Sequence, residues 1–421
     1  MPPLLGAIAD DFTGATDLAG MLVKNGMRSA QMIGVPAHTP PEGLDAIVVA
    51  LKTRTTPAKD AVDASLAALA WLREAGCRQF IFKYCSTFDS TSKGNIGPVA
   101  DALMAALGTD FSIACPAFPA NGRTIFRGYL FVGDVLLNEC GMQNHPLTPM
   151  TDANLVRVLQ PQSKHKVGLV RQESVSQGAV EIQRAFADVR QKGVGIAIVD
   201  AVSNADLTEI GYACRDLPLV TGGSGLAIGL AANFRAQGLL PAEGGAGRLP
   251  HVDGHAAVVS GSCSLATQRQ VAALKSVAPA FQIDPRQLAA GNDVVSEAVE
   301  WAVPRLAAGP PLIYATADAE QVRAIQQELG AERAGALVEN ALAAIARRLV
   351  DSGVRRLIVA GGETSGAVAG ALGVTGLRIG EEIDPGVPWT VTMNHPALAL
   401  ALKSGNFGTD DFFLKAWSRL P

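Results

Sequence analysis

Two adjacent carboxylates, Asp10 and Asp11, follow the first apolar run of the sequence and precede a Thr-Gly turn. In open α/β sheets, ligands bind beyond the carboxyl ends of the strands, so this position suits chemistry. Two carboxylates at a strand end repel each other, and a substrate hydroxyl or a cation would relieve that repulsion. The pair can act as a general base or bind a Mg²⁺-linked group. The alternative is that one Asp caps the next helix while the other is solvated.

A second polar set follows two later apolar runs and precedes a Gly-Asn-Ile-Gly helix start. It consists of Arg54, Lys83, Asp89, Ser90, Thr91 and Lys93. A small polyhydroxy acid requires a cation for its carboxylate and several polar partners for its hydroxyl groups, and this set supplies both. The alternative is a solvated Ser/Thr loop with helix caps.

Three glycine-rich segments each follow an apolar run in the second half of the chain: Ser260–Ser264, Gly361–Gly366 and Ser404–Gly408. Glycine permits close approach of the backbone, and free amides at a helix start attract phosphate. The Walker A pattern of P-loop proteins is missing. The GxGxxG fingerprint is missing as well, which argues against a dinucleotide site. We therefore expect a nucleotide-phosphate site of another type. A fourth glycine turn, Thr221–Gly225, fits a ligand loop and a packing turn equally well.

The elements that must position these residues follow from the alternation of short apolar runs with amphipathic helical patterns, which predicts an α/β fold with mainly parallel sheets. In the first half we expect strands at 4–9, 29–34, 44–51, 79–84, 111–116, 166–170, 194–200 and 217–221. In the second half strands should open the segments HAAVVSGSCS, PPLIYATAD, RRLIVAGGETSG and LALALKSGNFG. Thr56 and Pro57, a capping hydroxyl before a proline, predict a helix that ends at Gly76.

The glycine- and proline-rich stretch 238–254 predicts a linker. We expect an acid-sugar-binding domain at 1–240, a linker at 241–254 and a nucleotide-binding domain at 255–421. Each domain should be a mainly parallel sheet flanked by helices, with the active site in the interdomain cleft.

Composition excludes several other classes. The 421 residues are 48% hydrophobic and 18% charged, which argues against disorder. A net charge of −4 with 5% aromatic residues gives no footprint for a nucleic-acid partner. The six cysteines show no zinc or disulfide spacing. The N-terminus lacks a basic segment, and Asp10-Asp11 interrupt its apolar stretch, so we expect a cytoplasmic protein with no membrane partner.

Six motifs, in order along nearly the whole chain, resemble the four-carbon acid sugar kinase family. In the first half they are IADDFTGATDLAGMLVKNGM, KYCSTFDSTSKGNIGPV and CPAFPANGRT with GYLFVGDVLLNE; in the second half they are VSGSCS, VAGGETSG and KSGNFG. The first two are most similar to the 3-oxo-tetronate 4-kinase branch. Kinases of threonate or erythronate are the alternative within the family.

The resemblance implies transfer of the γ-phosphoryl group of ATP to the terminal hydroxyl of a four-carbon sugar acid. It assigns the substrate to Asp11, Arg54, Lys83, Asp89, Ser90, Thr91 and Lys93. It assigns ATP to Ser260, Ser262, Gly361, Gly362, Glu363, Thr364, Ser365 and Gly405. We expect Asp11 to be the general base, with Asp10 as the second candidate, and Arg54 and Lys83 to bind the anionic groups of the substrates. We expect Mg²⁺ to bind the nucleotide, and the sequence does not identify its protein ligands.

Two other classes are weighed against a kinase. A nucleotide-dependent dehydrogenase would need a nicotinamide site, against which the missing GxGxxG counts. A non-catalytic sensor of sugar acid and nucleotide would leave the phosphate-type loops without a purpose. The partners expected are therefore a small sugar acid and ATP, with a homo-oligomer possible for the chain.

Overall fold

The computed structural model describes residues 2–37, 42–145, 147–241 and 244–420. The chain divides into two compact units, Met1–Gly247 and Arg248–Pro421. The segment expected to be a linker, 241–254, includes this division. Its positions 242 and 243 lie outside the described residues, and 244–254 contain no helix or strand.

The first unit is built on a parallel sheet whose strands follow the order β2-β3-β1-β4-β11-β5-β10-β9. The strands are β1 (Leu5–Ala9), β2 (Ser29–Ile33), β3 (Ala46–Ala50), β4 (Gln79–Lys83), β5 (Ser112–Cys115), β9 (Lys166–Val170), β10 (Val194–Val199) and β11 (Leu219–Gly222). Most are continuous apolar runs because parallel strands covered on both faces have no solvent side. The predicted fold class is thus confirmed for this unit.

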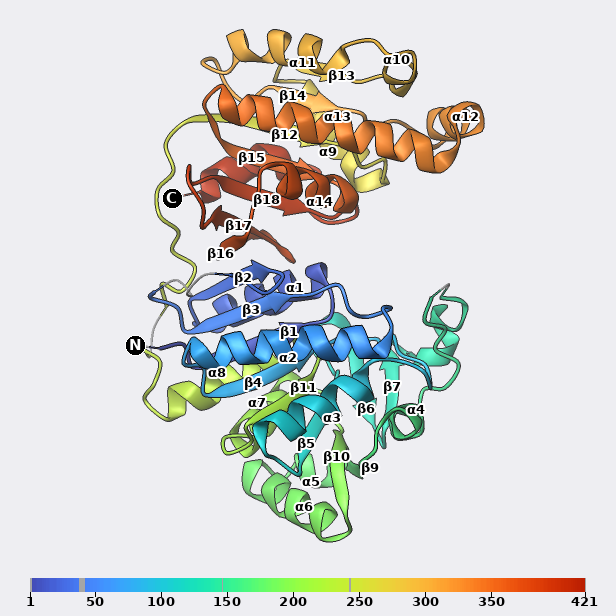
Figure 1. Cartoon of the computed structure of the whole chain (residues 1–421), viewed down its shortest axis with the longest axis vertical. Helices are drawn as coiled ribbons and strands as arrows, with labels where there is room; N and C mark the ends of the chain where they lie inside the picture. Colours follow the sequence, from blue (N-terminus) through green and yellow to red (C-terminus); the bar gives the residue numbers. More distant parts are fainter. Residues whose placement is uncertain (1, 38–41, 146, 242–243, 421) are drawn as a thin grey trace. The chain divides into compact units, whose positions relative to one another are not determined.

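Helices cover both faces of this sheet (Figure 1). They are α1 (Phe12–Lys24), α2 (Ala58–Glu74), α3 (Ile96–Leu107), α4 (Leu155–Leu159), α5 (Gln172–Val175), α6 (Ala179–Gln191), α7 (Asn204–Ala213) and α8 (Leu226–Ala236). Helices α2 and α3 pack against each other, and α1, α8, α7 and α6 form a second contiguous row. A separate antiparallel sheet contains β6 (Arg123–Phe126), β7 (Tyr129–Val132) and β8 (Val135–Leu136).

One local prediction is wrong. Pro57, not Thr56, occupies the N-cap position of α2, and no side chain caps that helix end. The Thr56 hydroxyl instead donates to the carbonyl of Thr53, at 3.2 Å, inside the loop that precedes the helix. The hydroxyl therefore stabilises the loop that carries Arg54, because Ser and Thr side chains bond readily to nearby backbone.

The second unit has the strand order β13-β14-β12-β15-β18-β17-β16. The strands are β12 (His255–Ser260), β13 (Ala280–Gln282), β14 (Leu312–Tyr314), β15 (Val354–Ala360), β16 (Gly376–Asp384), β17 (Val387–Thr392) and β18 (Ala399–Lys403). The pairs β13–β14, β14–β12, β12–β15 and β15–β18 are parallel, and the pairs β18–β17 and β17–β16 are antiparallel. This mainly parallel sheet also confirms the predicted class.

The helices of the second unit are α9 (Leu265–Lys275), α10 (Pro285–Ala289), α11 (Val294–Ala302), α12 (Ala319–Leu329), α13 (Ala331–Asp351), α14 (Gly362–Ala371) and α15 (Phe412–Lys415). The long helix α13 buries Leu342, Ile345 and Leu349 completely. These residues lie three and four apart, as one face of a helix requires. Among the residues that the structure describes, no helix combines the length and apolarity needed to span a membrane.

Candidate active site

The strand register of the first unit brings the predicted polar residues to one edge of the sheet. Central strand β1 pairs with β3 and β4, and Ala9 lies opposite both Ala50 and Lys83. The chain runs from β1 to β2 and β3 on one side and then to β4 on the other. Such a reversal opens a crevice beyond the carboxyl ends of the strands. Asp10, Asp11 and Arg54 follow directly at this edge.

Arg54 is the centre of a carboxylate cluster. Its Nε and Nη2 donate to the two oxygens of Asp10, each at 2.8 Å, and Nη2 also donates to Asp11 Oδ1 at 2.8 Å. Its Nη1 lies 3.5 Å from Asp89 Oδ2. The guanidinium is therefore occupied by protein carboxylates. Its first role is to hold these carboxylates in place, and it is not a free anion-binding group for a ligand.

Burial and charge act against each other in this cluster. Asp10 is 5% exposed, and desolvation raises the pKa of its carboxyl despite the opposing pull of Arg54 and Lys83. Desolvation also acts against the charge of Arg54, yet the hydrogen bond and charge of Asp10, with the charge of Asp11, raise the pKa of the guanidinium. Because both oxygens of Asp10 accept from a guanidinium that does not deprotonate in proteins, we treat Asp10 as ionised.

Asp11 combines a structural and an available oxygen. Its Oδ1 accepts from the Gly14 amide at 3.0 Å, so Asp11 is the N-cap of α1, as one interpretation of the sequence allowed. Its Oδ2 accepts no hydrogen bond within the described part of the chain. The side chain is 31% exposed, against 7% for Asp10. A carboxylate with one oxygen held in place and the other open to a substrate suits a general base, so Asp11 fits that role better than Asp10.

Lys83 ends β4 beside these aspartates. The residue is 3% exposed, and a Cβ placed on Gly14 would lie 2.6 Å from its Nζ and 2.3 Å from Asp11 Oδ1. Its ammonium makes no hydrogen bond and no ion pair of 4.0 Å or less with the residues that the structure describes. A buried cation requires compensation, so Lys83 is the better placed of the two predicted clamps.

The loop after β4 places the remaining predicted residues unevenly. Phe88 and Asp89 have φ angles of 66° and 42°, a left-handed conformation that is costly for residues with a side chain and is concentrated at functional sites. Thr87 donates to Asp89 Oδ1 at 2.6 Å, and Ser90 donates to Gln162 at 3.1 Å. Thr91 is half-buried, whereas Lys93 is exposed and forms no ion pair within the described residues.

Sequence reasoning missed Asn95, which holds the Arg54 loop. Its side-chain amide donates to the carbonyls of Thr53 at 2.7 Å and of Thr56 at 2.8 Å. The residue is buried at the start of α3. The sequence indicated Asn95 only as part of a predicted helix start. An Asn at such a position can cap the helix or bond to a distant loop, and the sequence does not distinguish the two roles.

In the second unit, the register brings the three glycine-rich loops together. Ser260 lies opposite Ala360, and Ala360 lies opposite Lys403, so the strands end at one level. The amides of Gly261 and Ser262 donate to the carbonyl of Ala360 at 2.9 and 3.2 Å. The three predicted loops therefore form one surface at the carboxyl edge of this sheet.

Close approach explains two of the glycines. Gly361 has a φ of 127°, and a Cβ there would lie 2.8 Å from Thr364 Oγ1 and 3.2 Å from the backbone nitrogen of Ser262. A Cβ on Gly405 would lie 2.5 Å from Ser262 Oγ. Both positions thus exclude larger residues because loops of different strands meet there.

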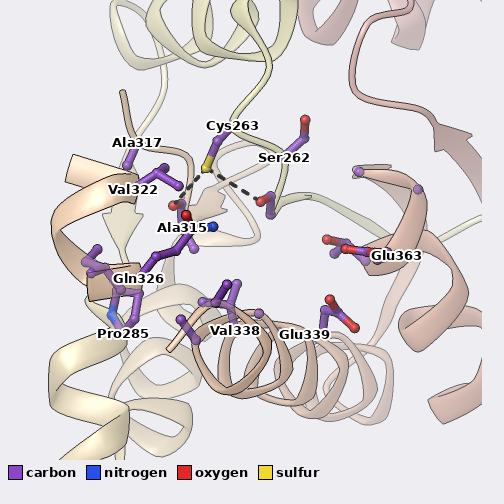
Figure 2. Close-up of a pocket in the computed structure, with 18 residues that line it drawn as sticks. Ser262, Cys263, Pro285, Ala315, Ala317, Val322, Gln326, Val338, Glu339 and Glu363 are labelled. Carbon is purple, nitrogen blue, oxygen red and sulfur yellow. Dashed lines mark hydrogen bonds between the residues drawn. The ribbon is translucent and has the colours of Figure 1, made fainter. Parts of the chain in front are cut away.

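A cavity of about 480 Å³ adjoins two of these loops (Figure 2). One part is lined by Gly261–Cys263 and Gly361–Thr364. The rest is largely apolar and includes Ala315, Val322 and Val338. A volume of this size with a polar and an apolar end fits a small organic ligand.

The predicted ATP residues differ in what they expose. Ser262, Gly361, Gly362, Glu363 and Thr364 line the cavity. Ser260 is fully buried, and its hydroxyl is paired with Thr316 at 2.8 Å. Ser365 is buried as well. Ser260 and Ser365 can therefore shape the loops, while the five residues that line the cavity can contact a ligand. Gly405 is not among the residues that line it.

Two carboxylates face each other at the polar end of the cavity, Glu339 from α13 and Glu363 from α14 (Figure 2). Desolvation, the charge of Glu363 and a hydrogen bond with it raise the pKa of Glu339. Sequence reasoning missed Glu339, which lies on a helix face and carries no motif. No group of three or more metal-ligating side chains occurs among the described residues.

Lys403 was also missed as a separate residue, although it lies in the KSGNFG motif. It is fully buried, and its ammonium donates to Thr267 Oγ1 and to the carbonyls of Ser404 and Gly405, each at 3.0 Å. Thr267 and Gln270 of α9 also bond the loop that begins at Ser404. These three residues fix the third glycine loop.

The fourth glycine turn, Thr221–Gly225, is a packing turn. A Cβ on Gly222 would lie 2.1 Å from the Cys115 carbonyl oxygen, and one on Gly225 would lie 2.4 Å from that of Ala117. The glycines allow the backbone after β11 to pass next to that after β5. Of the two interpretations left open, the structure supports packing.

Comparisons with known proteins match nearly the whole chain. A family model described as a sugar-binding N-terminal domain matches residues 5–230, and one described as a nucleotide-binding C-terminal domain matches 257–413. A protein of Burkholderia multivorans named 3-oxo-tetronate kinase is 62% identical over 98% of this chain and 96% of its own length. One of Haemophilus influenzae with the same name is 48% identical over 97% of this chain and 98% of its own.

A solved structure also matches closely. The crystal structure of a Haemophilus influenzae protein has a TM-score of 0.93 and 47% identity, with 99% of this chain and 100% of that chain covered. The fold of both units is therefore shared with an experimentally determined structure.

Proposed function

We infer the function of this chain from its family, because it belongs to the four-carbon acid sugar kinases, as its six motifs predicted. It is a phosphotransferase that uses ATP to phosphorylate the 4-hydroxyl of 3-oxo-tetronate. The observation that carries this conclusion is the match to proteins named 3-oxo-tetronate kinase over nearly the full length. The names of these relatives favour this branch over threonate or erythronate kinases.

We propose that the sugar acid binds at the Asp10–Arg54–Lys83 cluster of the first unit. Asp11, with one open oxygen, would orient the 4-hydroxyl and accept its proton. The Lys83 ammonium, without an ion pair in the described structure, would bind an anionic oxygen. Asp89, Ser90 and Thr91 would contact the other hydroxyl groups, while exposed Lys93 would reach the substrate only through its long side chain.

We propose that the nucleotide binds in the 480 Å³ cavity of the second unit. The glycine loops would hold the phosphates, since exposed amides bind phosphate oxygens. The apolar side chains of Val322 and Val338 would contact the base. This arrangement supports the predicted assignment of ATP to the second unit, and Ser260 and Ser365 would act by shaping the loops.

The Mg²⁺ requirement is part of the proposal. Mg²⁺ is held mainly by nucleotide phosphates and one or two carboxylates, and it neutralises phosphate charge. Glu339 and Glu363 fit such an ion, because desolvation and the charge of Glu363 raise the pKa of Glu339 and a divalent cation would favour its charged form. We propose these two as the protein side of the Mg²⁺ site. A cytoplasmic location and a homo-oligomeric state stay predictions.

The reaction is tested by a coupled assay of ADP release with ATP and a panel of four-carbon acids. The panel contains 3-oxo-tetronate, its 2-oxo isomer, threonate and erythronate. We expect turnover to be fastest with 3-oxo-tetronate and absent with a 4-deoxy analogue, which lacks the phosphate acceptor. Faster turnover of a plain aldonate would place the protein in the sister branch, and ADP release independent of any acid would refute a sugar acid kinase.

A further inference from the structure

Lys403 is a buried cation with an unusual environment. It is fully buried at the end of β18, and its three ammonium hydrogens have three acceptors: Thr267 Oγ1 and the carbonyl oxygens of Ser404 and Gly405, each at 3.0 Å. All three acceptors are neutral. Among the described residues, no carboxylate lies within ion-pair distance of Lys403. The positive charge is thus hydrogen-bonded but not neutralised, which is costly in a protein interior.

The charged groups on neighbouring elements are engaged elsewhere. Burial lowers the pKa of Lys403 from 10.5 to about 8. On α9, Arg269 lies 4.0 Å from exposed Asp410, and Lys275 lies over the Tyr314 ring. On β15, Arg355 and Arg356 donate to backbone carbonyls. Glu363 of α14 lies beside Glu339, and Asp384 of β16 is paired with Lys415.

The hydrogen bonds of Lys403 also determine where the loop amides point. In a trans peptide, the C=O and the following N–H point in opposite directions. The carbonyls of Ser404 and Gly405 point at Lys403, so the amides of Gly405 and Asn406 point away from it. Within the described part of the chain, neither amide donates a hydrogen bond. Adjacent free amides that point to the same side can bind an anion together.

Gly405 lies next to a residue that lines the nucleotide cavity. A Cβ on Gly405 would lie 2.5 Å from Ser262 Oγ, and Ser262 lines the cavity. The Gly361 amide donates to the backbone carbonyl of Lys403 at 2.8 Å, so Lys403 contacts a second glycine loop as well. The loops that meet at Lys403 are those assigned to the phosphates.

We propose that Lys403 is a positioning residue of the nucleotide site: it orients the Gly405 and Asn406 amides toward the phosphates and supplies the positive charge that the phosphates neutralise. This inference rests on the proposed function, because it requires a nucleotide in the second unit. Bound phosphate favours the charged lysine. Nucleotide binding is therefore coupled to protonation of Lys403, with full affinity below the pKa of the free protein and loss of affinity as the pH rises through that of the complex.

The coupling is measured on the full-length wild-type protein by titration calorimetry with ADP, in two buffers of different ionisation enthalpy. If phosphate raises the pKa of Lys403 from about 8 by one unit, binding at pH 8.5 takes up about half a proton, and affinity falls about tenfold by pH 10. If ADP binds without proton uptake, and if its affinity does not change between pH 7 and pH 10, the inference is overturned. This test needs no variant, so a misfolded mutant cannot obscure it.

A matched pair of variants separates position from fold. In Lys403→Met we expect ADP to bind about tenfold or more weakly and without proton uptake, while adenosine, which lacks phosphate, binds within about twofold of wild type. Lys275→Met removes an exposed lysine from the other end of α9 and should change neither. Equal losses of ADP and adenosine affinity in Lys403→Met would show a purely structural role and refute the inference.

The failure of this inference differs from that of the proposed function. If wild-type protein binds ADP with proton uptake but does not phosphorylate 3-oxo-tetronate, the function falls and the role of Lys403 stands. If it phosphorylates the sugar acid but ADP binding takes up no proton, the reverse holds.

Discussion

Replacing Arg54 with methionine should damage the first unit in two separable ways. The guanidinium donates to both oxygens of Asp10 and to Asp11 and lies 3.5 Å from Asp89. Without it, the charge of Asp10 stays buried beside two further carboxylates. Removing one partner of a buried ion pair costs about 3–5 kcal/mol. For a unit of this size, that loss corresponds to a fall of roughly 6–20 °C in melting temperature.

The assay is thermal unfolding of the full-length protein with and without ADP, with turnover of 3-oxo-tetronate measured in parallel. Arg28→Met is the matched control, because Arg28 forms a similar two-bond pair with Asp45, at 3.0 and 2.8 Å, with a side chain 51% exposed. Asp45 is buried, but it would still accept from the Arg28 backbone amide at 2.9 Å, and the guanidinium that is removed is exposed to water, so the loss should be smaller than in Arg54→Met. Arg54→Met should lose sugar-acid turnover, while ADP should still raise its melting temperature because the nucleotide cavity belongs to the other unit.

The pH dependence of Arg54→Met tests the cause. In the variant, burial raises the folded-state pKa of Asp10 above its unfolded value, since the guanidinium no longer opposes it. The charged form then destabilises the fold, so the loss should shrink as the pH falls through that raised pKa. Equal melting temperatures for the Arg54 and Arg28 variants, or a loss that does not change with pH, would refute the electrostatic argument.

The remaining predictions concern three single changes. Asp11→Asn should lower kcat by about 10²–10⁴-fold in the coupled assay, because the base is lost while the amide oxygen can still cap α1. Gly405→Ala should raise KM for ATP and leave KM for the sugar acid unchanged, because the new Cβ would lie 2.5 Å from Ser262 Oγ. In wild type, calorimetric affinity for Mg²⁺–ADP should fall on acidification through the raised pKa of Glu339, and Glu339→Gln should remove that dependence.

Each of these has a result that contradicts it. Unchanged kcat in Asp11→Asn would exclude Asp11 as the base. A Gly405→Ala enzyme whose sugar-acid KM rises as much as its ATP KM would separate Gly405 from the nucleotide. A pH dependence retained in Glu339→Gln would assign it to another group, with Glu363 the nearest alternative.

The parallel sheets could be predicted because the sequence of each strand identifies it as a strand. A strand buried on both faces is a short apolar run, and residues at its carboxyl end appear in the sequence directly after it. Asp10, Lys83 and the loop after Ser260 were found in this way. Their grouping follows from topology alone, since parallel neighbours end at one edge.

What could not be predicted depends on contacts between distant segments. The sequence shows that Arg54 is a cation near a strand end, but not that Asp10, Asp11 and Asp89 surround it. Asn95 looks like a helix start and serves as a bridge to another loop. Thr56 looks like a cap and bonds backward instead. In each case the residue type permits two local roles, and tertiary structure selects one.

Lys83 and Lys403 show how environment divides chemistry between the units. Each is a buried lysine at the end of a parallel strand and is followed by a polar loop. Lys83 lies beside Asp10, in a cluster where Asp10, Asp11 and Asp89 outnumber Arg54 and Lys83, so an anionic oxygen bound by Lys83 would lie next to carboxylates that can accept a proton. Such a cluster suits the hydroxyl end of a sugar acid, which needs a base. Lys403 has no carboxylate partner in the part of the chain that the structure describes, and an unbalanced buried cation suits phosphate. A strand-end lysine would therefore bind an anionic oxygen beside a base in one sheet and offset phosphate charge in the other, and the carboxylates around each lysine account for the difference.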